Sequence, residues 1–169
     1  MCWLSNLFKP KPPILTIPHP EESRNFQSNI DDLSFFLILE EWFGKWKVPL
    51  SYQYFWRARP IVIVPGLAYQ GANYPALTWT DRTEIDPTWA NPGVLAHEMA
   101  HVSYSFLTIT DVAQFNITYQ EVKSDALVKL LESQNQYMKT NTTELHAEIY
   151  RYLGEKMPDK LKAFYPKLF

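Results

Sequence analysis

Hydrophobic and polar residues follow two different periods along this chain, one typical of helices and one typical of strands. From about Ile30 to Trp46 apolar residues recur every three or four positions, which predicts an amphipathic helix that ends before Pro49. The next stretch instead holds β-branched or alternating runs bounded by turn residues, which predicts short strands. The predicted strands cover residues 52–57, 61–64, 76–80 and 82–85.

The second half of the chain is predicted to be mainly helical. Asn91 and Pro92 favour a helix start, because asparagine is a good N-cap and proline fits the first helical position. The apolar stripe of this helix consists of Leu95, Met99, Val102 and Phe106. The predicted helices cover residues 92–107, 118–132 and 141–153, with a polar loop at 133–143 and a last short helix after Pro158.

The order of these elements predicts an α+β fold. We expect a small, twisted, mostly antiparallel sheet packed on the N-terminal helix and on the 92–107 helix, with a C-terminal helical part. Asn141 is expected to cap the 141–153 helix, with Glu144 as its capping-box partner. Five prolines among the first 20 residues predict an extended arm at residues 1–20, which leaves residues 21–169 as a single domain.

Composition narrows the function classes. A formal charge of −2 gives no basis for nucleic-acid binding. The longest clean apolar stretch, residues 35–39, is too short to span a membrane, and no secretory signal is recognised, so we expect a cytoplasmic protein. Cys2 is the only cysteine, which excludes an intrachain disulfide and a cysteine-based zinc site. The oligomeric state is left open.

His97, Glu98 and His101 fit the pattern H-E-x-x-H on the predicted 92–107 helix. Histidines four residues apart lie one turn apart on the same helix face, so both imidazoles can bind one metal ion. The carboxylate of Glu98 can take a proton from a water that the metal activates. A catalytic zinc usually has three protein ligands and one water, so a third ligand is expected elsewhere in the chain.

The identity of the third ligand distinguishes the zinc-peptidase families. The metzincin pattern fails, because Tyr104 and Leu107 occupy the positions of its glycine and third histidine. Glu121 lies 20 residues after His101 on the next predicted helix, and Asp125 follows it by four. In this order the motif resembles the gluzincins, the thermolysin-like zinc metallopeptidases. The resemblance implies that Glu121 completes a His2Glu zinc site and that Asp125 supports a ligand histidine.

The resemblance covers roughly residues 60–131 and implies a zincin-like domain with one zinc ion per chain. Gluzincins stabilise the oxyanion of the reaction with a histidine or tyrosine from a downstream helix, and His146 and Tyr150 are the candidates for that role. Further candidates are Tyr104 and Tyr119 for the oxyanion, and Asp111 as a replacement for Glu121.

The expected activity is zinc-dependent hydrolysis of peptide bonds in a peptide or protein substrate. Glu98 acts as the general base and later delivers the proton to the leaving amine. The 76–80 strand is a candidate to bind an extended substrate through its backbone. The alternative is a non-catalytic protein on a zincin scaffold that binds a peptide or protein partner, with zinc in a structural role. A third possibility is a zinc-free interaction domain, in which His97 and His101 are polar surface positions.

Overall fold

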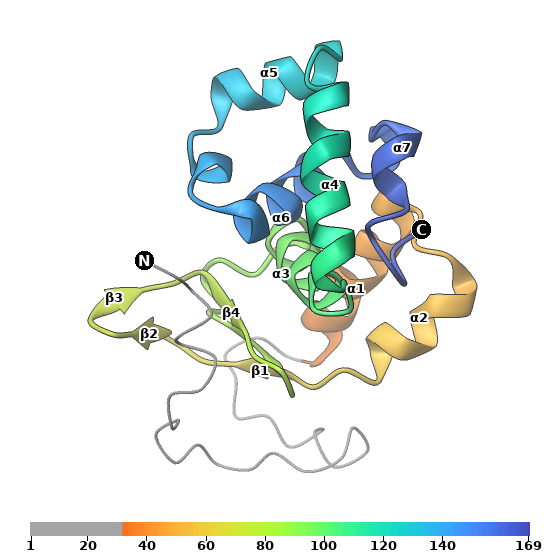
Figure 1. Ribbon diagram of the computed structural model, residues 1–169. Coiled ribbons are helices and arrows are strands. Elements are labelled where there is room, and N and C mark those ends of the chain that lie inside the picture. Colours follow the sequence, from red (N-terminus) through yellow and green to blue (C-terminus); the bar gives the residue numbers. More distant parts are fainter. Residues whose placement is uncertain (1–31) are drawn as a thin grey trace.

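A computed structural model of the protein describes residues 32–169 and shows helices grouped beside a small sheet (Figure 1). The α+β prediction is therefore confirmed, while the arm predicted at residues 1–20 lies outside the described residues. The helices are α1 (Asp32–Trp46), α2 (Leu50–Arg57), α3 (Pro92–Tyr104), α4 (Ile109–Val122), α5 (Ala126–Gln134), α6 (Thr142–Leu153) and α7 (Asp159–Lys162), with short 3-10 turns η3 (Tyr137–Lys139) and η4 (Gly154–Lys156). The strands are β1 (Ile61–Ile63), β2 (Ala68–Tyr69), β3 (Ala72–Asn73), β4 (Ala76–Thr78) and β5 (Thr83–Ile85).

The main sheet has three strands in the order β1-β5-β4. β1 runs parallel to β5, with Ile61 opposite Thr83, and β4 runs antiparallel to β5, with Ala76 opposite Ile85. β2 and β3 form a separate antiparallel pair. The predicted strands at 61–64, 76–80 and 82–85 are thus present, each slightly shorter than expected. β4 is an edge of this sheet and packs against α3.

α3 is the central helix of the fold and packs against α1, α6 and β4 (Figure 1). Asn91 caps it as predicted, because its side-chain oxygen accepts hydrogen bonds from the backbone N–H groups of Gly93 and Val94. Nine of its residues are buried, so the helix is covered on almost every side rather than along one stripe. Phe106 of the predicted stripe falls outside the helix and is 45% exposed.

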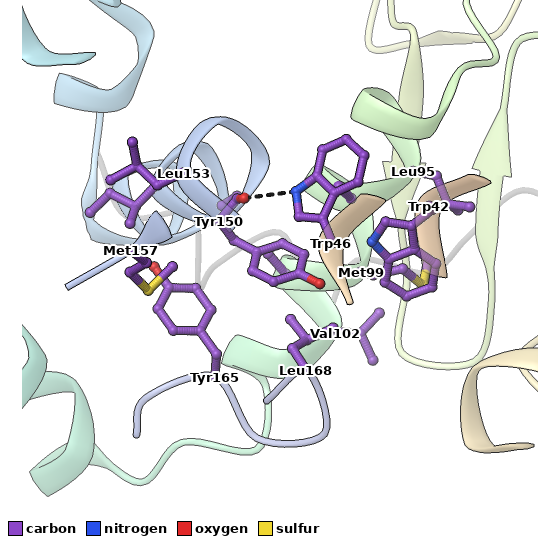
Figure 2. Close-up of a cluster of buried hydrophobic side chains, with 14 of the residues drawn as sticks. Trp42, Trp46, Leu95, Met99, Val102, Tyr150, Leu153, Met157, Tyr165 and Leu168 are labelled. Carbon is purple, nitrogen blue, oxygen red and sulfur yellow. Dashed lines mark hydrogen bonds between the residues drawn. The ribbon is translucent and has the colours of Figure 1, made fainter. Parts of the chain in front are cut away.

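The core joins α1, α3, α6 and the C-terminal segment (Figure 2). The indole N–H of Trp46 donates to the carbonyl of Tyr150 at 3.0 Å and so ties α1 to α6. Gly154 ends α6 with φ +47°, and a Cβ there would lie 2.8 Å from Cδ1 of Trp46. Glycine is required at this position by both the backbone conformation and the close approach of the indole ring.

Residues 52–57, predicted as a strand, instead belong to α2. Tyr52, Phe55 and Trp56 lie three and four positions apart and all pack against the core, which is the spacing of a helix face. The Trp56 indole donates to the carbonyl of Lys167 at 2.7 Å and contacts Trp42 edge-on. Packing of this face overrides the strand preference of an aromatic segment.

The predicted helix at residues 118–132 is also wrong, because two helices replace it. α4 begins earlier, after a capping box formed by Thr108 and Asp111, and ends at Val122. Asp125 then caps α5 by accepting from the backbone N–H of Leu127 at 2.9 Å. The chain therefore turns between the two halves of the expected helix.

The C-terminal third follows the prediction more closely. Asn141 caps α6, which ends at Leu153, and α7 follows Pro158 as the predicted short helix. The loop expected at 133–143 contains the short turn η3. Among the described residues no helix is both long and apolar enough to cross a membrane, and the cytoplasmic location stays a prediction.

Candidate metal centre

α3 and α6 lie side by side and bring His97, His101 and Glu144 together. The Nε2 atoms of the two histidines are 2.9 Å apart. Oε2 of Glu144 lies 3.3 Å from Nε2 of His97 and 3.6 Å from Nε2 of His101. One ligand atom from each side chain falls within 4.8 Å of the others, so this group could hold a metal ion.

Two of the three separations between these atoms, 3.3 Å and 3.6 Å, are close to those in a metal centre, whereas the 2.9 Å between the two Nε2 atoms is a hydrogen-bond distance. Metal–ligand bonds of about 2.0–2.1 Å in a tetrahedral centre place neighbouring ligand atoms roughly 3.3 Å apart. The side chains of His97 and His101 are only 10% and 15% exposed, so the expectation that they are polar surface positions is wrong. Oε2 of Glu144 is buried against the two imidazoles without a well-aligned hydrogen bond, and a metal ion would give this oxygen a direct ligand contact.

A second glutamate on α6 holds the outer side of His97. Oε1 of Glu148 lies 2.6 Å from Nδ1 of His97, and the Asn135 amide donates to the other oxygen of Glu148. This carboxylate lies beside Nδ1 without an aligned hydrogen bond to it, and it leaves Nε2 facing the cluster. Glu148 is therefore the carboxylate placed to support a ligand histidine, a role that the sequence predicts for Asp125.

The charges of these groups depend strongly on one another. Burial lowers the pKa of His97, but its contacts with Glu144 and Glu148 outweigh burial and raise the pKa to about 9. Burial raises the pKa of Glu144, but its contacts with His101 and His97 lower it to about 2. Without a metal ion, Glu144 is thus ionised and His97 protonated at physiological pH, so metal binding would require His97 to release its proton.

Glu98 is buried at the border of the cluster, between α3 and the edge strand β4. The hydroxyl of Thr78 on β4 donates to Oε2 of Glu98 at 2.6 Å. The charge of Glu98 contributes to the raised pKa of His97. The predicted general base therefore lies close to the histidines, with one carboxylate oxygen held by the sheet.

Tyr137, on the turn η3, is a neighbour of the cluster that the sequence did not reveal. Its ring centroid lies 6.3 Å from that of His97, and the side chain is about half exposed. Burial raises the pKa of the Tyr137 hydroxyl, and the carboxylates of Glu144 and Glu98 raise it further. The hydroxyl keeps its proton and can donate a hydrogen bond beside the cluster.

The structure does not bring the predicted third ligand, Glu121, to the histidines. Its carboxylate is exposed on α4 and pairs with the ammonium of Lys160 at 3.2 Å. Asp125 is occupied as the N-cap of α5 rather than as a partner of a histidine. Glu144 takes the place of Glu121 in this group because α6 packs against α3 and brings the Glu144 carboxylate to the histidines.

The two residues predicted to stabilise the oxyanion, His146 and Tyr150, are both fully buried in the core. Nε2 of His146 lies 2.8 Å from the carbonyl oxygen of Phe164, and its ring stacks on Tyr165 at 3.8 Å. Burial lowers the pKa of His146 to about 3, so the ring is neutral. Tyr150 lies among core residues beside Trp46 (Figure 2). Neither prediction is supported, since Glu144 and Glu148 occupy the face of α6 that meets the histidines.

The remaining candidates also have other partners. The ring of Tyr104 packs edge-on against His146 with centroids 5.2 Å apart. The hydroxyl of Tyr119 donates to Glu132. Asp111 accepts hydrogen bonds from Thr108 in the capping box of α4. None of these three side chains belongs to the metal-binding group found among residues 32–169.

The sequence contains a pattern that could have identified Glu144 as a member of the cluster, although it also fits a helix cap. Glu144 and Glu148 are four residues apart on one helix, which is the spacing noted for Glu121 and Asp125. The sequence predicts that Glu144 belongs to a capping box, because it lies three residues after Asn141. Its backbone N–H does donate to Asn141 at 2.9 Å, but its carboxylate turns to the histidines.

Comparison of the chain with known proteins found no matching family model, no matching curated protein and no matching solved structure. The arguments about function therefore rest on the residues of this chain and on their geometry.

Proposed function

We propose that this protein is a zinc-dependent metallopeptidase, with His97, His101 and Glu144 as the zinc ligands and Glu98 as the general base. The observation that carries the proposal is the placement of a buried glutamate next to a three-ligand group. A structural metal site needs only its ligands, whereas an additional carboxylate beside an open coordination position is what metal-assisted hydrolysis requires.

Two nitrogen ligands and one carboxylate oxygen suit zinc, and three protein ligands leave a fourth position free in a tetrahedral centre. Zinc bound here would supply Lewis-acid chemistry: activation of a water molecule and polarisation of the carbonyl of the bond to be cleaved. Glu144 would contribute the negative charge that partly neutralises the ion. Glu148 would keep the imidazole of His97 oriented toward it.

The protein residues around the ion have separate tasks in this proposal. Glu98 accepts the proton of the attacking water and passes it to the leaving amine. Tyr137 replaces His146 and Tyr150 as the candidate that donates a hydrogen bond to the developing oxyanion, because its hydroxyl faces the carboxylates of the cluster. We take the substrate to be a peptide or protein segment, because the H-E-x-x-H pattern of His97 to His101 is typical of zinc peptidases.

Glu98→Gln tests the proposal directly. The full chain is loaded with zinc, and hydrolysis of fluorescently labelled, unfolded casein is measured beside zinc content and thermal unfolding. The variant is expected to lose at least about 100-fold in activity with unchanged zinc content, because only the proton acceptor is removed. Glu121→Gln is the matched control and should retain full activity. Activity that survives in Glu98→Gln, or a zinc-loaded wild type without activity on any unfolded protein, contradicts the proposal.

A second candidate is a non-catalytic protein in which the metal joins α3 to α6. It is favoured by the burial of the proposed ligands, since Glu144 is only 2% exposed. In that case removal of zinc destabilises the protein, while neither wild type nor Glu98→Gln cleaves a peptide bond.

A further inference from the structure

A row of hydrogen bonds leads from Arg59 through the main sheet to Glu98. Nε of Arg59 donates to the hydroxyl oxygen of Thr83 at 3.1 Å. The hydroxyl oxygens of Thr83 and Thr78 are 3.3 Å apart, and Thr78 donates to Oε2 of Glu98 at 2.6 Å. Thr83 is fully buried and Glu98 is 6% exposed, so solvent does not compete strongly for these groups.

The donors and acceptors allow only one direction along this row when Glu98 is ionised. A guanidinium has no acceptor, so Arg59 must donate to Thr83. A carboxylate has no proton, so Thr78 must donate in its 2.6 Å contact with Oε2 of Glu98. The backbone carbonyl of Glu98, 3.2 Å from the same hydroxyl, is a second and longer acceptor. The single hydroxyl proton of Thr83 then points to the oxygen of Thr78. Each hydroxyl therefore accepts from one side and donates to the other, an arrangement in which neighbouring bonds polarise and strengthen one another.

Arg59 is itself held by the turn that joins β4 to β5. Its Nη2 donates to the carbonyl of Trp79 at 2.7 Å and to the carbonyl of Arg82 at 2.8 Å. The two backbone carbonyls thus hold the guanidinium of Arg59, the positive end of the row, in one position. Asp81 and Glu98 are the acidic groups whose charges act on Arg59.

We propose that Thr78, backed by Thr83 and Arg59, is a positioning residue that holds Oε2 of Glu98 and leaves Oε1 as the oxygen that takes the proton from the attacking water. This inference rests on the proposed role of Glu98 and adds the part of the fold that orients it. A carboxylate without such a partner rotates freely about its terminal bond, and either oxygen can then turn away from the reacting water.

A double-mutant cycle measured by thermal unfolding tests the row without any substrate. The zinc-loaded full chain is compared with Thr78→Val, Glu98→Gln and the double variant. Thr78→Val should lower the unfolding midpoint by roughly 3–6 °C when Glu98 is present, because a charge-assisted hydrogen bond is lost. It should lower the midpoint by less than half as much in the Glu98→Gln background, where the acceptor is neutral. Thr80→Val, at an exposed position after β4, is the control and should give no coupling.

Equal shifts of Thr78→Val in both backgrounds would overturn the inference. If Thr78→Val does not fold, the same cycle with Thr83→Val decides, with a smaller coupling of the same sign expected because Thr83 is one hydrogen bond further from the carboxylate. The cycle is independent of catalysis, so its failure is distinguishable from failure of the proposed peptidase function.

Steady-state kinetics on labelled casein then separate positioning from binding. Thr78→Val should reduce kcat roughly tenfold with KM and zinc content unchanged, and Thr78→Ser should restore most of kcat because it keeps the hydroxyl. A loss confined to KM, or no rescue by serine, contradicts the positioning role. If wild type leaves casein intact, the proposed function fails while the cycle still decides whether Thr78 holds Glu98.

Discussion

Two regions of this protein each offer a pair of carboxylates four residues apart, and only one pair meets the histidines. On α6, Glu144 and Glu148 are 2% exposed and face α3. At the corner between α4 and α5, the side chain of Glu121 is 52% exposed and pairs with Lys160. The same spacing in the sequence therefore contributes to a buried group that could hold a metal ion in one place and to a solvated surface in the other.

The difference arises from helix continuity and from packing. α6 runs unbroken through both of its glutamates, so the two carboxylates lie one above the other on a single face. α4 ends at Val122, so Glu121 and Asp125 do not share a helix face. Contact between α3 and α6 then excludes water from the first pair, and the buried carboxylates are stabilised by the two imidazoles.

The largest expected effect separates the two candidate ligands. Glu144→Ala should weaken zinc binding by more than about 1000-fold, since removal of a direct ligand exceeds the 10- to 100-fold cost of losing an outer partner. Glu121→Ala, the matched control, should bind zinc as wild type does. Titration against a competing chelator measures both affinities. Strong zinc binding that survives in Glu144→Ala but not in Glu121→Ala would reverse the assignment.

The two regions also differ in their tyrosines. Tyr137→Phe should reduce kcat roughly 100-fold with little change in zinc affinity, because a hydrogen-bond donor at the oxyanion is lost. Tyr119→Phe removes a hydroxyl that serves Glu132 on α5 and should leave kcat unchanged. Equal activity of Tyr137→Phe and wild type on labelled casein would remove Tyr137 from the mechanism.

Glu148 and Asp125, the second carboxylate of each pair, are expected to differ less in their effect on zinc affinity. Glu148→Gln should weaken zinc binding roughly 10- to 100-fold, because His97 loses the partner that orients its ring. Asp125→Ala should leave zinc affinity unchanged and lower the free energy of unfolding by about 1 kcal/mol through the loss of the α5 cap. Chelator competition and chemical denaturation together measure the pair. A zinc affinity lowered by Asp125→Ala would show that the capping role is incomplete.

The smallest effect on zinc binding and activity is expected from Tyr150, a residue of α6 that lies in the hydrophobic core. Tyr150→Phe removes a buried hydroxyl that interacts with the Trp42 indole and not with the histidines, so the free energy of unfolding should fall by about 1 kcal/mol. Zinc affinity and kcat should stay at the wild-type level. A large loss of kcat in this variant would restore the role that the sequence suggested for Tyr150.

Features that depend on neighbouring residues could be predicted from the sequence. The start of α3 is set by Asn91 and Pro92, and the spacing of His97 and His101 within a helix places their imidazoles together. The third ligand could not be predicted in this way, because it depends on which distant helix packs on α3. Glu144 lies more than 40 residues beyond His101, and its backbone position near a helix start supported a different interpretation.

Strand and helix assignments failed for a related reason. Residues 50–57 contain aromatic residues that suit a strand, and only the contact of Trp56 with Trp42 and Lys167 favours a helix there. The corner at Asp125 was missed because the apolar pattern continues across it from Val122 to Ala126. At residues 50–57 the deciding contacts come from residues that are distant in the chain. At Asp125 the deciding interaction is a helix cap that interrupts an otherwise regular apolar pattern.

The burial of α3 on almost every side has a consequence for how the protein opens. Amide hydrogens of a helix enclosed by the core exchange with solvent mainly when the whole domain unfolds, whereas exposed helices such as α5 open locally. The two histidines therefore belong to the slowest-opening part of the molecule. The imidazoles keep their spacing through local fluctuations, so an ion that enters finds them already ordered and little conformational entropy is lost on binding.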